Sequence, residues 1–160
     1  MSAGVETAMI QRPDIEVYSP DGKLQLVAEV KNKKGATAEW AADMRRNLFA
    51  HSVVPYSPYF LLALPDHFYL WKNEISAIDE RLPDYGASSR PILEHHLHNS
   101  SHYLETMSEY GLELVINSWL NKLVNANLTR ETASPDEAWL FDSGLYDAIK
   151  NGFVKTEATV

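Results

Sequence analysis

The stretch PDIEVYSPDGKLQLVAEVK, residues 13–31, decides the fold of this chain. Residues 15–18 and 24–31 are rich in β formers, and they flank a turn signal with Asp21-Gly22 at its centre. An Asp-Gly pair between two such runs is a strong hairpin signal. We therefore predict two antiparallel strands joined by a turn over residues 19–22.

The predicted hairpin brings two carboxylates together. If the turn is centred between Asp21 and Gly22, Asp14 lies directly opposite Glu29, Glu16 opposite Val27 and Tyr18 opposite Gln25. Because side chains alternate between the faces of a strand, Lys31 shares their face. A bulge at Gly22 would shift this register by one residue. The polar face consists of Asp14, Glu16, Tyr18, Gln25, Val27, Glu29 and Lys31, and the apolar face of Ile15, Val17, Leu26, Ala28 and Val30.

Two carboxylates that face each other at about 5 Å between Cβ atoms repel, so something must compensate for them. A hard divalent cation does so, because Mg²⁺ prefers carboxylate oxygens and water. With the ammonium group of Lys31 alongside, the site suits phosphodiester hydrolysis. A carboxylate pair also serves glycoside cleavage, but a neighbouring lysine disfavours the protonated acid which that reaction needs, and this alternative ranks low.

Pro13-Asp14, followed fifteen residues later by Glu29-Val30-Lys31, resembles the motif of the PD-(D/E)XK restriction-endonuclease-like superfamily. The resemblance covers roughly residues 1–75. It implies a central mixed β-sheet flanked by helices, an α/β fold, and a metal-dependent endonuclease that cleaves DNA with Mg²⁺ or Mn²⁺.

The resemblance also implies roles for individual residues. Asp14 and Glu29 would bind the metal with the backbone carbonyl of Val30, and Lys31 would assist the attacking water. Glu6, on a short helix expected over residues 2–11, corresponds to an additional acidic residue near the metal. A Gln-x-x-x-Tyr signature of some relatives is missing from the helix after the lysine, so the branch of the superfamily stays open.

The rest of the chain extends this core. Trp40, Met44 and Leu48 recur at helical spacing and predict an apolar stripe that leaves Arg45 and Arg46 exposed. Residues 73–102 are rich in turn signals and predict a loop with one short strand at most. The further elements expected are a helix over 37–50, strands over 59–64 and 68–72, a helix over 105–125 and a short helix after residue 136. We expect one domain of 160 residues, with a core over about 1–75 and a C-terminal helical extension over about 104–160.

Charge is distributed unevenly along the chain. The formal net charge is −8, yet residues 1–50 are neutral, with seven basic and seven acidic side chains. Lys33, Lys34, Arg45 and Arg46 follow the candidate catalytic strand, and we expect them to contact the phosphate backbone of DNA. A solvated charged surface is the alternative explanation for this cluster.

Two further features bear on the class of protein. The chain has no cysteine, which excludes disulfides and thiolate metal sites, and no apolar run approaches the ~20 residues of a membrane helix. We expect a soluble, cytoplasmic protein without a membrane partner. His95, His96, His98 and His102 form a dense cluster that suits a transition metal, although a solvated loop explains it as well.

The leading hypothesis is therefore a Mg²⁺-dependent nuclease that acts on DNA, alone, as a homodimer or as the catalytic part of a larger complex. The main alternative is a nuclease-fold module that has lost catalysis and serves in binding or assembly, which the acidic second half of the chain also fits.

Overall fold

A computed structural model describes residues 13–51, 54–72, 81–98 and 103–156, and it has an α/β architecture with a mixed six-stranded sheet. The strands are β1 (Ile15–Tyr18), β2 (Leu24–Val30), β3 (Tyr59–Ala63), β4 (His67–Lys72), β5 (Tyr85–Ser88) and β6 (Phe153–Thr156). The helices are α2 (Ala38–His51), α3 (Arg90–His96), α4 (Tyr103–Thr106), α5 (Glu109–Val124), the 3₁₀ turn η1 (Pro135–Glu137), α6 (Ala138–Asp142) and α7 (Leu145–Ile149). The helix expected over residues 2–11, with Glu6, lies outside the described residues.

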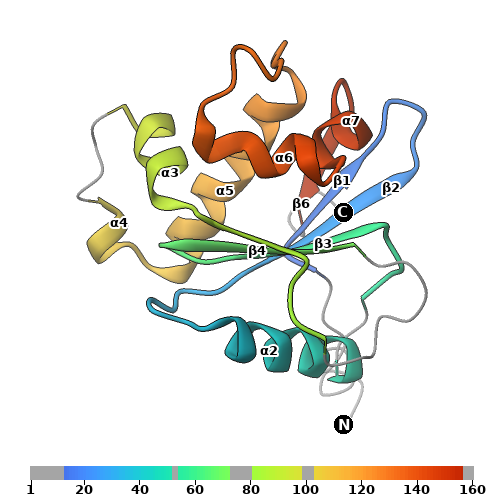
Figure 1. Cartoon of the computed structure of the whole chain (residues 1–160). Coiled ribbons are helices and arrows are strands. Elements are labelled where there is room, and N and C mark those ends of the chain that lie inside the picture. Colours follow the sequence, from blue (N-terminus) through green and yellow to red (C-terminus); the bar gives the residue numbers. More distant parts are fainter. Residues whose placement is uncertain (1–12, 52–53, 73–80, 99–102, 157–160) are drawn as a thin grey trace, which may run out of the picture.

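The sheet has the strand order β5-β4-β3-β2-β1-β6 and is covered on both faces. Helix α2 lies on one face, and α3, α5, α6 and α7 lie on the other (Figure 1). β2 and β3 are parallel, while the other neighbouring strands are antiparallel. Parallel neighbours need a crossover connection, and α2 supplies it. The predicted sheet flanked by helices is confirmed at this level.

The first hairpin forms as predicted, but its turn is built differently. The Gly22 amide donates to the Ser19 carbonyl, and Gly22 has a φ of 86°, a left-handed conformation that favours glycine. The turn therefore contains a bulge at Gly22, which shifts the register by one residue. Tyr18 pairs with Leu24, so the predicted pairing of Tyr18 with Gln25 is wrong.

A second irregularity restores the predicted register further along the hairpin. Between the pairs Tyr18↔Leu24 and Val17↔Leu26, Gln25 is an extra residue on β2. From there Glu16 pairs with Val27 and Ile15 with Ala28, as expected. The two bulges compensate, so the open end of the hairpin keeps the facing arrangement on which the site depends.

Helix α2 begins after Thr37, whose Oγ1 accepts a hydrogen bond from the Trp40 amide at 3.1 Å. Its buried face carries Ala41, Ala42, Arg45 and Leu48, so the expected stripe is rotated. The small alanines allow the helix to approach the sheet, and Arg45 is turned inward with it. The prediction that Arg45 is exposed is wrong, because its side chain is 0 % exposed.

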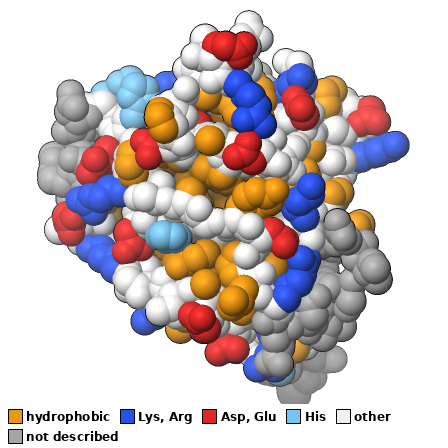
Figure 2. All heavy atoms as spheres, viewed as in Figure 1, with side chains coloured by type: hydrophobic (Ala, Val, Ile, Leu, Met, Phe, Trp, Pro, Cys, Tyr) orange, Lys and Arg blue, Asp and Glu red, His pale blue; other side chains and the backbone are white. Residues whose placement is uncertain are grey.

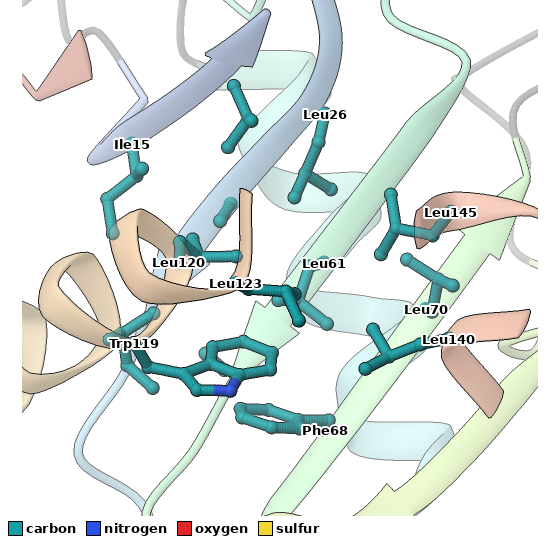
Figure 3. Packing of buried hydrophobic residues seen from close by; sticks show 14 of the residues in the cluster. Ile15, Leu26, Leu61, Phe68, Leu70, Trp119, Leu120, Leu123, Leu140 and Leu145 are labelled. Atoms are coloured by element: carbon teal, nitrogen blue, oxygen red, sulfur yellow. The ribbon is translucent and has the colours of Figure 1, made fainter. Parts of the chain in front are cut away.

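The opposite face holds the larger apolar core (Figure 3). Phe68 on β4 stacks on Trp119 of α5, with ring centroids 4.9 Å apart. Trp139 of α6 completes the cluster at 5.5 Å from Phe68. Leu61 and Leu120 are fully buried beside these rings. Interlocked large side chains of this kind dominate core stability.

Several elements of the second half were not predicted. Residues 73–102 contain the one short strand expected, β5, but also helix α3, which begins at Arg90 with Pro91 in its first turn. The helix expected over 105–125 is divided into α4 and α5, because Ser108 caps α5 through the Gly111 amide. Strand β6 was missed entirely. No helix among the described residues is long and apolar enough to cross a membrane.

Candidate metal centre

The open end of the hairpin brings Asp14 and Glu29 together. Asp14 directly precedes β1, and Glu29 is the penultimate residue of β2. The pairing of Ile15 with Ala28, carried one residue further, sets Asp14 opposite Glu29. Glu29 is only 6 % exposed, whereas Asp14 is half-buried. The predicted carboxylate pair therefore exists, with one buried and one more accessible member.

A backbone hydrogen bond orients Asp14. Its Oδ2 accepts from the Val30 amide at 2.8 Å. The next amide, that of Lys31, donates in the opposite direction, to the Ala63 carbonyl of β3 at 3.1 Å. Because the carbonyl and amide of one strand residue point to the same side, the Val30 carbonyl faces the side of Asp14. The two carboxylates thus lie opposite each other, and the Val30 carbonyl is directed to the side of β1.

The electrostatics of the pair are dominated by Glu29. Burial raises the pKa of Glu29 to about 9, and the charge of Asp14 and the hydrogen bond with its side chain act in the same direction. The hydrogen bond with the Asp14 backbone acts in the opposite direction. The nearby ammonium group of Lys31 opposes this rise. Without a cation, the pair therefore holds a proton at neutral pH. A bound cation would have to displace that proton, as metal binding to protonated ligands generally requires.

Lys31 completes the arrangement. It follows the last residue of β2 and is half-buried, and its charge acts on Glu29. An amine whose charge acts on a carboxylate pair can neutralise charge or donate a hydrogen bond to a water molecule. The structure brings Asp14, Glu29 and Lys31 to one end of the hairpin, as the alternation of strand side chains predicts.

The donor set fits a hard cation in part. Two carboxylates and a carbonyl are oxygen ligands, which suit Mg²⁺ with water filling the remaining positions. Among the residues that the structure describes, no cluster of three or more His, Asp or Glu side chains is arranged to hold a metal ion. Glu6, the expected additional acidic residue, lies outside that part of the chain. The described donors are therefore the carboxylates of Asp14 and Glu29 and the Val30 carbonyl.

The four basic residues expected to contact DNA have different environments. Lys33 is exposed, with its Nζ 5.5 Å from the centroid of the Trp40 ring. Lys34 forms an ion pair with Glu105 at 3.2 Å, and Arg46 is partly buried. On the face seen in Figure 2, basic and acidic side chains are interspersed. These residues do not form one continuous basic surface.

Arg45 belongs to the core under α2 instead. Its guanidinium group lies 5.0 Å from the Phe49 ring centroid and 5.4 Å from the Trp71 ring centroid. A planar cation stacked on aromatic rings contributes to packing as well as to electrostatics. Its burial does not suit direct contact with a phosphate backbone.

The histidine cluster lies on the other side of the sheet. His95 and His96 line a pocket of about 540 Å³ between α3, α5 and the segment after α5, with Trp119 and Lys122. Burial lowers the pKa of His96, and its Nε2 lies 3.0 Å from the Ser118 Oγ. His98 is exposed, and His102 is outside the described residues. The sequence did not indicate this pocket, because its lining comes from segments far apart in the chain.

Three comparisons of this chain, with models of protein families, with curated proteins and with solved structures, each found no match.

Proposed function

We propose that this chain is a Mg²⁺-dependent nuclease that hydrolyses phosphodiester bonds of DNA. The observation that carries the proposal is the convergence of Asp14 and Glu29, with Lys31 acting on the same carboxyl group. Phosphodiester hydrolysis needs a cation site, a means to activate water and a positive group for the transition state. The open end of the hairpin offers residues for each.

The roles follow from the environments of the residues. Asp14, held by the Val30 amide, presents its other oxygen to the cation, and Glu29 supplies a second carboxylate from the opposite strand. When bound, Mg²⁺ polarises a phosphoryl oxygen and lowers the pKa of a water molecule. Lys31 orients the attacking water or neutralises the charge that develops on the phosphate.

The order of elements supports a PD-(D/E)XK-like fold. An antiparallel hairpin with the carboxylates at its open end leads through α2 to β3, which is parallel to β2. We propose that this unit is the nuclease core and that the helices after about residue 104 extend the same domain, to whose sheet β6 adds the strand beside β1. The proposal for a DNA substrate rests on the resemblance of the motif and on Lys33.

One observation favours the second candidate, a nuclease-fold module without catalysis. With the pKa of Glu29 raised to about 9 by burial and by Asp14, the pair resists the loss of the proton that a cation must displace. Burial of Arg45 and pairing of Lys34 with Glu105 also reduce the basic surface. Such a module would bind a partner through its fold and would not respond to Mg²⁺.

Cleavage assays decide between the two candidates. Supercoiled, linear and single-stranded DNA are incubated with the pure protein and Mg²⁺ or Mn²⁺, beside Lys31→Ala and Lys33→Ala. We expect metal-dependent cleavage that Lys31→Ala reduces by about 100-fold or more. Lys33→Ala, which removes an exposed lysine two residues away, should lose only a small factor. Equal activity of Lys31→Ala and the wild type would refute the proposed role, and no cleavage of any DNA would favour the binding module.

A further inference from the structure

The segment directly after Lys31 is attached to the helices of the opposite face. The Asn32 amide donates to Glu109 Oε1 at 2.8 Å, and the Asn32 side chain donates its Nδ2 to the Met107 carbonyl at 3.0 Å. Both partners are more than 70 positions away in the sequence. Hydrogen bonds of this kind tie the exit of β2 to the start of α5.

Lys31 is therefore held at the backbone on both sides. Its own amide donates to the Ala63 carbonyl of β3, and the following amide donates to Glu109. Before it, the Val30 amide donates to Asp14. Three successive amides thus have three different acceptors, one from a strand and two from carboxylates. The bond to Glu109 is the only one of the three that comes from the helical layer.

Glu109 is well placed to act as a fixed acceptor. It is the first residue of α5, directly after the cap residue Ser108, and α5 is anchored in the core by Leu112 and Ile116. A carboxylate in the first turn of a helix is also favoured by the helix dipole. The acceptor therefore sits on a rigid element and not on a loop.

A second contact supports the attachment a few residues further on. Lys34 pairs with Glu105 of α4 at 3.2 Å, and Glu105 also pairs with Arg90 of α3. The hydrogen bonds to Arg90 first and to Lys34 second lower the pKa of Glu105, which favours its charged form. Exposed pairs are individually weak, but here they join the same two segments as the Asn32 bonds.

We infer that Glu109 is a positioning residue, which holds Lys31 beside the carboxylate pair by fixing the Asn32 amide. This inference rests on the proposed function for its catalytic consequence. Lysine has a long flexible side chain, and the position of its Cα determines where the ammonium group can reach. Because small misplacements of catalytic groups reduce rates strongly, the helical layer then controls the chemistry on the other face of the sheet.

Four variants separate positioning from general stability. Glu109→Ala removes the acceptor, and Glu109→Asp keeps the charge at the helix start but shortens the side chain. Glu109→Gln keeps an oxygen acceptor at the same reach. Glu94→Ala is the matched control, because Glu94 belongs to the same network and pairs with Arg90 at 2.9 Å. In the described part of the chain, Glu94 forms no hydrogen bond with residues 31–35.

We expect Glu109→Ala and Glu109→Asp to lower kcat about tenfold while KM for DNA and the affinity for Mn²⁺ stay unchanged. Glu109→Gln and Glu94→Ala should retain wild-type kcat. A merely structural role would reduce kcat in proportion to the folded fraction, including in Glu94→Ala, and would not be rescued by Glu109→Gln. Wild-type kcat in Glu109→Ala would overturn the inference.

A second readout does not depend on turnover. In protein labelled with ¹³C at lysine Cε, the Lys31 resonance, assigned with Lys31→Ala, reports the surroundings of its ammonium group. We expect it to move toward the resonance of exposed Lys23 in Glu109→Ala and Glu109→Asp, and to stay in place in Glu109→Gln and Glu94→Ala. An unmoved resonance in the first two variants overturns the positioning role, whether or not the wild type cleaves DNA. Failure of the nuclease proposal alone would leave the shifts intact.

Discussion

The two faces of the sheet differ in what they bury. The face under α3, α5, α6 and α7 is apolar throughout its core, with Leu61, Phe68 and Leu120 packed against large rings. The face under α2 buries two ionisable side chains, those of Arg45 and Glu29. One face therefore supplies stability by the ordinary packing of apolar side chains. The other carries polar groups in a partly dry environment, where their electrostatic effects are strong.

The α2 face is also where an ionisable group with a raised pKa lies beside partly exposed polar groups. Among the residues that the structure describes, α2 covers this face, and Asp14 and Glu29 lie outside the apolar cluster beneath it. Outside that cluster, Glu29 is buried enough to have a raised pKa while Asp14 and Lys31 keep contact with solvent. A site built from perturbed groups beside solvent is typical of functional centres.

The largest expected effect lies on the apolar face. Leu120 is fully buried against the cluster of Phe68 and Trp119, so Leu120→Ala should lower the free energy of unfolding by about 3 kcal/mol. Chemical denaturation measures this change. The affinity of the folded variant for Mn²⁺ should equal that of the wild type. A large loss of metal affinity with little loss of stability would show that the two faces are not separable.

A smaller effect is expected for the buried cation of the α2 face. Arg45→Ala removes the contacts with Phe49 and Trp71 and should lower the free energy of unfolding by about 2 kcal/mol. Its affinity for DNA, measured well below the unfolding transition, should not change. A selective loss of DNA binding without destabilisation would restore the sequence-based prediction that Arg45 contacts the backbone.

At acidic pH the smallest change is expected for Glu29→Gln, because the glutamine mimics the protonated acid. The difference in stability between the two proteins grows as the pH rises. In the wild type, the pKa of Glu29 rises from its ordinary value of 4.5 to about 9 in the folded protein. The folded protein then binds more protons than the unfolded chain between these values. The stability that Glu29 contributes is full below about pH 4.5 and is lost as the pH rises toward about 9.

Denaturation of the two proteins in EDTA tests this pH dependence. Between about pH 5 and about pH 9, the wild type should lose more than about 1 kcal/mol relative to Glu29→Gln. Parallel curves for the two proteins would mean that Glu29 is ionised in the fold at neutral pH. The comparison of the faces would then lose its electrostatic basis.

Much of the first half of the fold could be predicted, because its signals are local. Alternation along residues 15–18 and 24–30, together with Asp21-Gly22, determines the hairpin, and the unbroken apolar run of β3 marks a strand buried on both faces. The rotation of α2 could not be predicted, because Ala41 and Ala42 give a weaker apolar signal than Trp40 does. Small side chains pack closest to a sheet but contribute little to a hydrophobic pattern.

The second half depends on contacts between distant segments. β6 has four residues, and its place beside β1 is determined by the pairing of Ile15 with Thr156. Helix α3 has Pro91 and two histidines within seven residues, which resemble a loop in composition. The hydrogen bond from Asn32 to Glu109 joins positions 77 residues apart, and no local sequence pattern around either residue indicates it. By contrast, the carboxylate pair was predictable, because it follows from the two-residue period of a strand. The second bulge restores the register that the bulge in the turn shifts.

The most direct test of the account is a calorimetric titration of Mn²⁺ into the wild type and Asp14→Asn. Runs in buffers of different ionisation enthalpy count the protons that are released. The account predicts one site in the wild type, the release of about one proton near neutral pH from Glu29, and loss of that site in Asp14→Asn. Absence of binding to the wild type, or binding that Asp14→Asn leaves unchanged, would contradict the claim that this carboxylate pair is a metal centre.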